Sequence, residues 1–356
     1  MKILHTADLH LTEKAEERWD ALDELVALAR SRQVSAMVIA GDLFDREVEA
    51  ETVRHRLRAA LRGSDFETII IPGNHDFKSY RSGLYFGDNI TVITDWQKPV
   101  VLGRIAFWGL PFEQISGGKI VNRLQEIASL ISPADKNILL FHGELLDTTF
   151  SRHELGDEGD RRYMPVKLSY FDSIPLQYVL AGHFHSRYAA WNLPGGGLFI
   201  YPGSPAAVTR RETGRRKANL VSTEEPPVEL ELNSFHYEEF KITLDPYETA
   251  NPLSMLDHKL EELHPSARLL LTVEGLFNSF SLGMNESELA QALIEKAAGC
   301  SAGEPVFDFY DVQHVLEDDL FKQFNARLAE TDCSPELKEQ VKEMVVRAFR
   351  VVKACS

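Results

Sequence analysis

The 356-residue sequence has few cysteines and no long hydrophobic run. Its three cysteines, Cys300, Cys333 and Cys355, lie far from the polar motifs described below. So few cysteines exclude the disulfide framework of a small secreted domain, and we expect free thiols in a reducing compartment. No apolar stretch reaches the roughly 20 residues that cross a bilayer, and Met1 leads directly into the first predicted strand. We therefore expect a soluble cytoplasmic protein without a membrane segment.

Positive charge is also scarce. The chain has 38 Lys and Arg residues against 54 Asp and Glu residues, which gives a net charge of -16. Such a chain has no overall attraction for a polyanion, so any binding of nucleic acid must depend on a local cluster. Thr213-Gly214 predicts a hairpin turn with a basic tip, although a hairpin that only faces solvent is the alternative. The predicted DNA-binding residues of this tip are Arg210, Arg211, Arg215, Arg216 and Lys217.

Five short polar motifs occur in a fixed order in the first half of the chain. They are Asp8-Leu9-His10, Gly41-Asp42, Gly73-Asn74-His75-Asp76, His142-Gly143 and Gly182-His183-Phe184-His185. Most follow a brief apolar run of the kind that forms a buried strand. These runs are residues 2–6, 36–40, 68–71, 138–141 and 178–181. Because ligand sites of open α/β sheets lie at the carboxyl ends of the strands, we expect the motifs to converge.

The residue types in these motifs favour a pair of divalent metal ions. Asp8 and His10 are two positions apart, and so are His183 and His185, so that each pair projects to one side of an extended segment. Imidazole, carboxylate and amide ligands without a thiolate suit manganese, iron(II) or zinc, whereas calcium avoids histidine. A single buried His or Asp is more often a hydrogen-bonded core residue than a ligand. Five such motifs in order favour the metal site.

The five motifs resemble those of the calcineurin-like metallophosphoesterase superfamily over about residues 1–225. Within it, the chain is most similar to the SbcD-type DNA double-strand-break repair nucleases. The residues that carry this similarity are Ile3-Leu4-His5-Thr6-Ala7-Asp8-Leu9-His10, Gly41-Asp42-Leu43-Phe44-Asp45 and Tyr201-Pro202-Gly203-Ser204. The resemblance implies an α/β fold, namely a four-layer sandwich of two mixed sheets flanked by helices.

The resemblance also implies a role for each motif residue. One metal ion would be held by Asp8, His10 and His185, the other by Asn74, His142 and His183, and Asp42 would bridge the two. A carboxylate is needed there to offset the repulsion of two dications roughly 3.5 to 4 Å apart. A metal-bridging hydroxide would attack phosphorus, with manganese the expected metal. His75 would contact the scissile phosphate and protonate the leaving group.

Two further residues are candidates near this centre. The segment from Gly41 to Arg46 is similar to the Gly-Asp-x-x-Asp-Arg segment of phosphoprotein phosphatases, in which the second Asp pairs with the motif histidine and Arg contacts phosphate. We hypothesise that Asp45 pairs with His75 and that Arg46 reaches a substrate phosphate. Archaeal members of the repair family commonly carry His at the position of Asp45, so this chain departs from them. Asp76 either supports the site or only caps a helix.

The chain is too long for one compact core, and its amino-acid composition changes at the polar, Pro-rich residues 223–227. We expect a catalytic domain over residues 1–225, a small α+β domain over 226–315 and a helical segment over 316–356. The expected elements after the boundary are strands 228–232 and 240–244, helix 252–263, strand 268–273, helix 286–298 and strand 306–312. The resemblance implies that the α+β domain caps the active site and helps to position DNA.

The last segment carries apolar residues at three- to four-residue spacing. They are Phe321, Phe324, Leu328, Leu337, Val341, Val345, Ala348 and Val352. This stripe packs on the chain's own body or docks a partner, which in the resembled family is an SMC-like ATPase with long coiled coils. The family also implies a homodimer.

Three functions remain open. The first is a metal-dependent DNA repair nuclease, exonuclease or endonuclease, that works beside a coiled-coil ATPase. The second is a small-molecule phosphodiesterase or phosphatase with the same metals, and the third is a non-catalytic scaffold. The capping domain and the C-terminal helices favour the first function, whereas the acidity of the chain favours the second.

Overall fold

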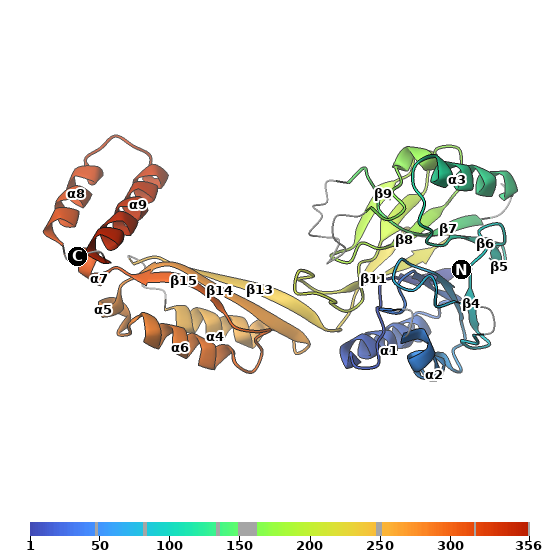
Figure 1. The fold of residues 1–356 in the computed structure, drawn as a ribbon, viewed down its shortest axis with the longest axis horizontal. Helices are drawn as coiled ribbons and strands as arrows, with labels where there is room; N and C mark the ends of the chain where they lie inside the picture. Colours follow the sequence, from blue (N-terminus) through green and yellow to red (C-terminus); the bar gives the residue numbers. More distant parts are fainter. Residues whose placement is uncertain are drawn as a thin grey trace. The chain divides into compact units, whose positions relative to one another are not determined.

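The computed structural model describes residues 1–46, 49–80, 84–132, 136–148, 162–246, 251–316 and 318–354. They form two compact units, Met1–Tyr237 and Glu238–Ser356. Each unit has a hydrophobic core of its own. Figure 1 shows the helices and strands of both units as a ribbon. Cys300 and Cys333 are free thiols, as expected, while Cys355 lies outside the described residues. Among the described helices, none has the length and apolar character needed to span a membrane.

The first unit contains two six-stranded mixed sheets. The strand order is β12-β11-β1-β2-β3-β4 in one sheet and β5-β6-β7-β8-β10-β9 in the other. The strands of the first sheet are β1 (Lys2–Thr6), β2 (Ala36–Ala40), β3 (Glu67–Ile71), β4 (Ile90–Val92), β11 (Lys217–Ser222) and β12 (Val228–Glu231). Those of the second are β5 (Val100–Leu102), β6 (Ile105–Leu110), β7 (Lys136–His142), β8 (Tyr178–Gly182), β9 (Ala189–Asn192) and β10 (Leu198–Tyr201).

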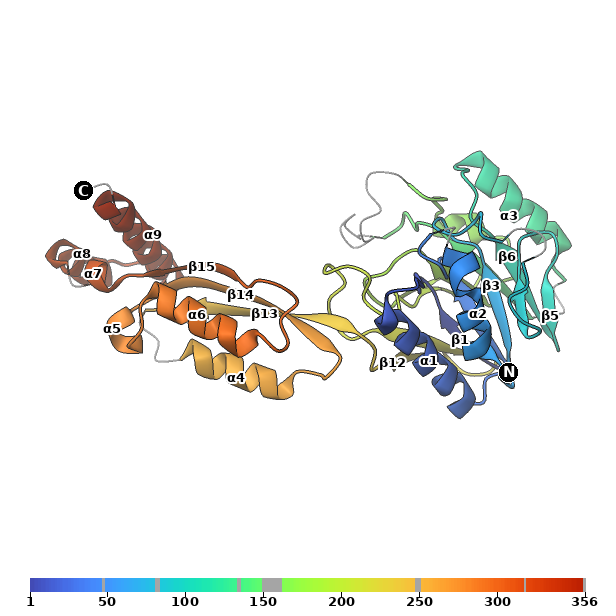
Figure 2. The same ribbon diagram turned by 60° about the horizontal axis from the view of Figure 1, so that its bottom comes forward.

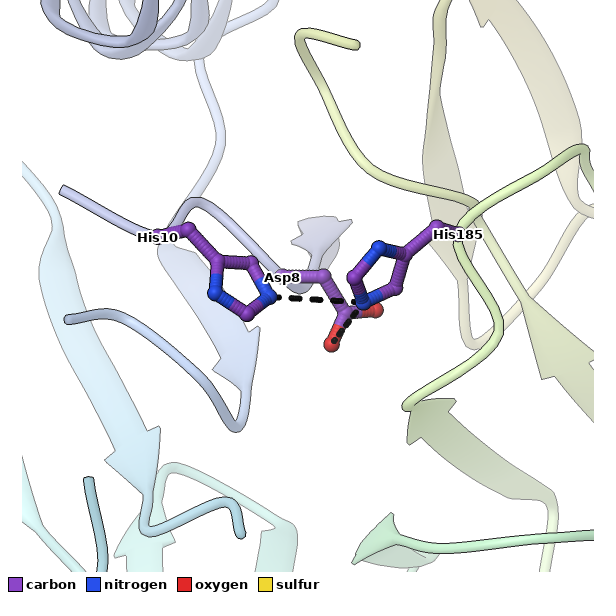
Figure 3. Close-up of side chains that lie close together, drawn as sticks. All are labelled: Asp8, His10 and His185. Carbon is purple, nitrogen blue, oxygen red and sulfur yellow. Dashed lines mark hydrogen bonds and ion pairs between the residues drawn. The ribbon is translucent and has the colours of Figure 1, made fainter. Parts of the chain in front are cut away.

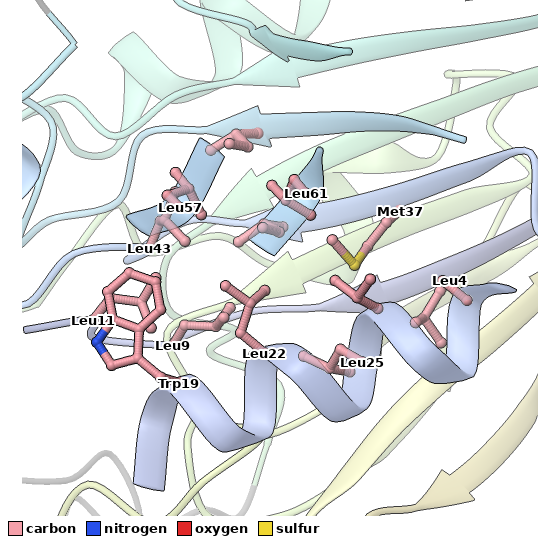
Figure 4. Close-up of a cluster of buried hydrophobic side chains, with 14 of the residues drawn as sticks. Leu4, Leu9, Leu11, Trp19, Leu22, Leu25, Met37, Leu43, Leu57 and Leu61 are labelled. Carbon is pink, nitrogen blue, oxygen red and sulfur yellow. The ribbon is translucent and has the colours of Figure 1, made fainter. Parts of the chain in front are cut away.

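Helices cover the outer face of each sheet. The first sheet carries α1 (Glu16–Ser31) and α2 (Glu49–Leu61), and the second carries α3 (Gly118–Leu130) and the 3-10 helix η2 (Leu168–Phe171). Helix α1 forms because its apolar residues recur at helical spacing, so that Trp19, Leu22 and Leu25 share one face. They belong to one buried cluster with Leu4 and Met37 of the sheet, and Figure 4 shows Trp19 beside Leu11 at the other end of that cluster.

A second apolar core lies between the two sheets. It joins Ile3 of β1 and Val38 of β2 to Ile138 of β7 and Leu180 of β8. Successive strand residues point to opposite faces, so Ile3 enters this core while Leu4 packs under α1. Burial on both faces explains why these strands are almost wholly apolar. The structure therefore confirms the four-layer sandwich of two mixed sheets flanked by helices.

The second unit is built on a three-stranded sheet in the order β13-β14-β15. The bounds are β13 (His236–Leu244), β14 (Ala267–Phe277) and β15 (Val306–Asp311), with helices α4 (Pro252–Glu262), α5 (Ser279–Leu282), α6 (Glu286–Ala297), α7 (Gln313–Leu316), α8 (Asp319–Ala329) and α9 (Pro335–Ala354). Helices α4 and α6 cover one face of the sheet (Figure 2). Part of the predicted C-terminal apolar stripe packs within this unit, because Phe321 joins Leu276 of β14 in a small buried cluster and Phe324 and Val345 pack against it.

The boundary between the two units lies later in the sequence than the composition suggests. Strand β12 pairs antiparallel with β11, so residues that we expected in the α+β domain complete the first sheet. The Pro-rich residues 223–227 form the connection between these two strands of one sheet. A tight connection and a linker share the same composition, and only the pairing partner of β12 distinguishes them. The boundary lies between Tyr237 and Glu238, not at residue 225.

Candidate metal centre

The five polar motifs meet at the carboxyl ends of five strands, which belong to both sheets. The Asp8, Asp42 and Asn74 motifs follow β1, β2 and β3, whereas His142 ends β7 and His183 follows β8. Because strands β1 to β3 and strands β7 to β8 run parallel within their sheets, their carboxyl ends share an edge. Side chains more than a hundred residues apart in sequence thus come into contact.

One group of side chains contains Asp8, His10 and His185. Their ligand atoms all lie within 4.8 Å of one another. The Nε2 atoms of His10 and His185 are 3.3 Å apart, and Nε2 of His185 lies 3.8 Å from Oδ1 of Asp8. Figure 3 shows the two rings turned toward each other with the carboxylate beside them. All three residues are buried, so the group can enclose a small cation.

The neighbouring group contains Asp42, His142 and His183, again within 4.8 Å of one another. Asn74 joins it, since its Oδ1 lies 2.9 Å from Nε2 of His142 and 3.1 Å from Nδ1 of His183. Asp42 contacts both groups. Its Oδ2 lies 3.1 Å from Nε2 of His142 and 3.9 Å from Nε2 of His10.

Asp42 is also the residue whose environment most clearly fits a metal. Its carboxylate is fully buried, and Oδ1 accepts a 2.9 Å hydrogen bond from the backbone N–H of His75. Oδ2 has no hydrogen-bond donor among the described residues. A buried carboxylate oxygen without a donor is costly unless a cation compensates it. The donor set and this oxygen therefore fit divalent ions held by nitrogen and oxygen ligands.

The charged groups in the centre shift one another's pKa values. Burial alone would raise the pKa of Asp42, but His142, His10 and His75 hold it well below its usual range. Burial alone would likewise lower the pKa of His142, yet Asp42 and Asp8 raise it to about 10. Burial raises the pKa of Asp8, although His185 and His142 partly oppose this. The buried carboxylates thus depend on positive charge between them, which divalent ions would supply.

The backbone at this edge is strained. Four of the seven predicted ligands have positive φ, namely Asp8 (56°), His10 (47°), Asp42 (48°) and His183 (101°). Such conformations cost L-residues on the order of 1 to 3 kcal/mol each and persist only where surrounding contacts hold them. Here the N–H of Asp8 donates to the carbonyl of Gly41, and the N–H of His10 donates to that of Asp42. Strain concentrated at one edge is typical of a functional site.

The motif glycines make room for the ligands themselves. A Cβ atom on Gly41, whose φ is +94°, would lie 2.0 Å from Nδ1 of His142. A Cβ on Gly73 would lie 2.1 Å from Oδ1 of Asp42. Only glycine allows the ligand side chains to approach the backbone this closely.

Asp45 contacts both His75 and His10, but through different atoms. Nδ1 of His75 lies 3.0 Å from the backbone carbonyl oxygen of Asp45. The Asp45 carboxylate lies 3.3 Å from Nδ1 of His10 and 3.3 Å from the guanidinium of Arg18. Burial alone would raise the pKa of Asp45, but His10 and Arg18 lower it to about 2. The hypothesis placed the carboxylate on His75, whereas the structure places it against a predicted metal ligand.

The other candidates at this edge differ in exposure. Arg46 has its guanidinium 3.7 Å from Asp45, and its side chain is 79% exposed, so it can reach a bound molecule. Asp76 is buried and accepts hydrogen bonds from the backbone N–H groups of Gly73 and Phe44 and from the hydroxyl of Tyr80. It therefore ties two ligand-bearing loops together, which decides the alternative left open by the sequence in favour of support.

The predicted DNA-binding cluster is divided by the fold. Arg210 and Arg211 are exposed, whereas Arg216 is 1% exposed and therefore unavailable to a phosphate. Arg215 donates to the carbonyl of Leu232, and Lys217 pairs with Glu229 on β12. The predicted hairpin is also wrong, because β10 and β11 lie in different sheets and the segment between them crosses from one sheet to the other. A one-dimensional charge pattern does not show which cations face inward.

Sequence reasoning missed Glu212, which lies behind His185. Its side chain is fully buried, with Oε1 3.3 Å from Nδ1 of His185. Burial alone would raise the pKa of Glu212, but His185 and Arg216 lower it to about 2. No motif marks this residue; the only signal was an acidic residue inside a run of arginines.

Comparison with known proteins finds a matching family and several similar proteins. The calcineurin-like phosphoesterase family matches residues 1–187. The chain is 26% identical over 233 residues to the DNA double-strand break repair protein Mre11 of Sulfurisphaera tokodaii, which covers 59% of this chain and 55% of that protein. It is 31% identical over 132 residues to a subunit of the nuclease SbcCD from Staphylococcus saprophyticus, over 33% of this chain and 35% of that protein.

The chain thus spans about half the length, or less, of these curated relatives. Among solved structures, a dimetal phosphatase from Danio rerio is similar with a TM-score of 0.46 and 12% identity, over 65% of this chain and 95% of that one.

Proposed function

Since the chain belongs to the calcineurin-like phosphoesterase family, we propose that it holds two divalent metal ions and hydrolyses phosphodiester bonds in DNA. The observation that carries the proposal is the position of Asp42. Its Oδ2 lies within 3.9 Å of a histidine nitrogen in each of the two ligand groups and has no donor among the described residues. A single carboxylate shared by two groups of nitrogen and oxygen donors suits a pair of cations and not one.

In this proposal the two ligand groups take one ion each. Asp8, His10 and His185 hold the first, Asn74, His142 and His183 hold the second, and Asp42 contacts both. Manganese suits the mixed nitrogen and oxygen donors best, while iron or zinc would also fit. Bound metals of this kind neutralise charge on a phosphoryl group and acidify a water molecule into a nucleophile.

The protein's own residues orient the substrate and move the proton. A carbonyl oxygen can only accept, so the contact of His75 with Asp45 places a proton on Nδ1. Nε2 of a protonated His75 can then donate to the leaving oxygen. The exposed guanidinium of Arg46 would contact a phosphate of the substrate.

DNA as the substrate is supported by the relatives, whose names describe a DNA repair protein and a nuclease. It is also supported by the exposed Arg210 and Arg211, which would give a local attraction that the net charge of -16 does not. The second unit would help to position DNA.

We further propose an SMC-like ATPase with long coiled coils as the partner, docked on α8 and α9. Phe321 and Val346 are buried within the second unit, but Leu320, Leu337 and Met344 are 64%, 47% and 70% exposed. A homodimer and a cytoplasmic location belong to the same proposal.

A small-molecule phosphodiesterase or phosphatase is the second candidate, because the net charge of -16 disfavours a polyanionic substrate. One assay separates the candidates. The chain is incubated with manganese and either 3′-labelled duplex DNA or bis-p-nitrophenyl phosphate, beside the Asp42→Asn variant. We expect cleavage of both substrates and loss of both activities in the variant. Cleavage of the small ester alone would support the second candidate, and inactivity on both would support a non-catalytic scaffold.

A further inference from the structure

Two buried residues of opposite charge, Glu212 and Arg216, lie behind His185, and neither is one of the seven proposed metal ligands. Glu212 is 0% exposed and Arg216 is 1% exposed. Both lie in the segment that links β10 to β11, which begins with Pro202-Gly203-Ser204 of the Tyr201-Pro202-Gly203-Ser204 motif. The proposed reaction uses none of these residues. Burial of a charged group is costly unless its contacts compensate it, so the contacts of both residues with His185 call for an explanation.

We propose that Glu212 is a positioning residue, which fixes the ring of His185 so that one nitrogen faces the metal site, and that Arg216 and Ser204 hold Glu212 in place. The inference rests on the proposed two-metal function and adds a residue that controls one of its two sites.

The two nitrogens of His185 have different neighbours. Nδ1 lies 3.3 Å from Oε1 of Glu212. A carboxylate only accepts hydrogen bonds, so Nδ1 carries the proton and Nε2 keeps its lone pair. Nε2 is the atom that faces Asp8 and His10 (Figure 3). The contact with Glu212 therefore selects the tautomer that a metal ligand needs.

The carboxylate of Glu212 is fixed because both of its oxygens accept hydrogen bonds. Oε2 accepts from the Ser204 hydroxyl at 2.8 Å and from the Val208 backbone N–H at 2.9 Å. Oε1 accepts from the backbone N–H of Thr209 at 3.0 Å and from its hydroxyl at 3.2 Å. Because both oxygens are held, the carboxylate cannot rotate away from His185.

Arg216 fixes the main chain around the same histidine. Its guanidinium donates to the carbonyl oxygens of His185, Ser186 and Ser204. It also donates to the Ser204 hydroxyl at 3.1 Å. One buried cation thus holds the backbone of His185 and the residue that holds Glu212. This network gives a role to the Ser204 motif and to an arginine that cannot reach DNA.

The network makes the two proposed metal sites unequal. In the first group, His10 and His185 each have a carboxylate behind the ring, from Asp45 and Glu212. In the second group, Nδ1 of His142 lies 2.8 Å from the uncharged backbone carbonyl of Ala40, and the carboxylate 3.9 Å from it, that of Asp8, is itself a proposed ligand of the first ion. A carboxylate behind an imidazole raises its basicity as a ligand, and loss of such a partner typically weakens metal binding about 10- to 100-fold. Loss of Glu212 should therefore affect the first site selectively.

Manganese binding to the full chain, measured by calorimetry, tests the inference. We expect two bound ions in the wild type. In Glu212→Gln we expect one site to weaken about 10- to 100-fold while the other is unchanged. Glu229→Gln is the matched control, because it removes a carboxylate that pairs with Lys217 away from the metal ligands. The histidine ¹⁵N spectrum of the metal-free wild type should show the His185 proton on Nδ1.

Wild-type affinity at both sites of Glu212→Gln, or a proton on Nε2 of wild-type His185, would overturn the inference and leave the two-metal proposal intact. Fewer than two ions bound to the wild type would overturn the two-metal proposal instead, while the tautomer would still report on Glu212. If Glu212→Gln does not fold by circular dichroism, Ser204→Ala removes one donor to Glu212 and should weaken the same site several-fold. Unchanged affinity in Ser204→Ala would then overturn the inference.

Discussion

The carboxylate of Asp45 lies 3.3 Å from Nδ1 of His10, while the backbone carbonyl of the same residue lies 3.0 Å from Nδ1 of His75. One residue thus contacts a proposed metal ligand through its side chain and the proposed acid through its main chain. The two contacts can be separated experimentally, because a side-chain substitution leaves the carbonyl in place.

Asp45→Asn should weaken manganese binding without changing the behaviour of His75, the proposed general acid. The substitution removes the negative charge beside His10, and loss of such a partner typically costs about 10-fold in metal affinity. His75 keeps its carbonyl contact, so the pH profile of kcat at saturating manganese should not move. Calorimetry and a pH series on bis-p-nitrophenyl phosphate measure the two effects. A shifted profile with unchanged metal affinity would restore the original pairing of the Asp45 carboxylate with His75.

Gly41→Ala should destabilise the first unit strongly. The new Cβ would lie 2.0 Å from Nδ1 of His142, at a φ of +94°. We expect a loss on the order of 3 kcal/mol in the free energy of unfolding, from the clash and the strained backbone together. Gly63→Ala is the control, because its φ is +70° but no atom lies within 4 Å of the added Cβ. Urea unfolding of both variants separates the effect of the clash from that of the strained backbone. Equal losses of unfolding free energy in the two variants would refute the close approach of Gly41 to His142.

His5 should make the fold sensitive to acid. Its side chain is fully buried, and burial lowers its pKa from 6.5 to about 3. The unfolded chain therefore binds a proton that the folded chain excludes, so stability is complete above pH 6.5 and falls progressively between pH 6.5 and about 3. At pH 5 the expected loss is about 2 kcal/mol. His5→Phe should lack this part of the pH dependence in urea titrations, whereas a variant of the exposed His258, His258→Gln, should retain it.

Arg210 and Arg211 should account for the salt dependence that the basic segment gives to DNA binding. Replacing both with Gln should make the plot of log K against log salt shallower, reducing the magnitude of its negative slope by up to about 2, because each lost phosphate contact contributes about 0.9. Arg215→Gln is the control, since Arg215 donates to the carbonyl of Leu232 and should change the slope little. An unchanged slope in the double variant would exclude the segment from the DNA contact.

Much of the catalytic fold was predictable because its signals are local. Residues 2–6 and 36–40 are apolar runs, and both form strands with the expected bounds. The motif residues follow their strands directly, so the convergence of Asp8, Asp42 and Asn74 required only the rule that parallel strands share a carboxyl edge. That His183 of the second sheet joins them depends on how the two sheets pack.

The unpredicted features depend on contacts between distant parts of the chain. Arg210 and Arg216 look alike in sequence, but the Arg216 guanidinium donates to the carbonyl oxygens of His185 and Ser204, which buries it, whereas Arg210 is exposed. The boundary at Tyr237 depends on β12 pairing with β11. Which atoms of Asp45 contact His10 and His75 depends on the backbone path after β2, which a motif does not specify.

The central claim is that seven side chains hold two metal ions around Asp42. Crystals soaked in Mn(II) and measured near the manganese absorption edge test it directly. The account predicts two anomalous peaks, one among Asp8, His10 and His185 and one among Asn74, His142 and His183, with Asp42 beside both. A map with no peak, or with a single peak, would contradict it.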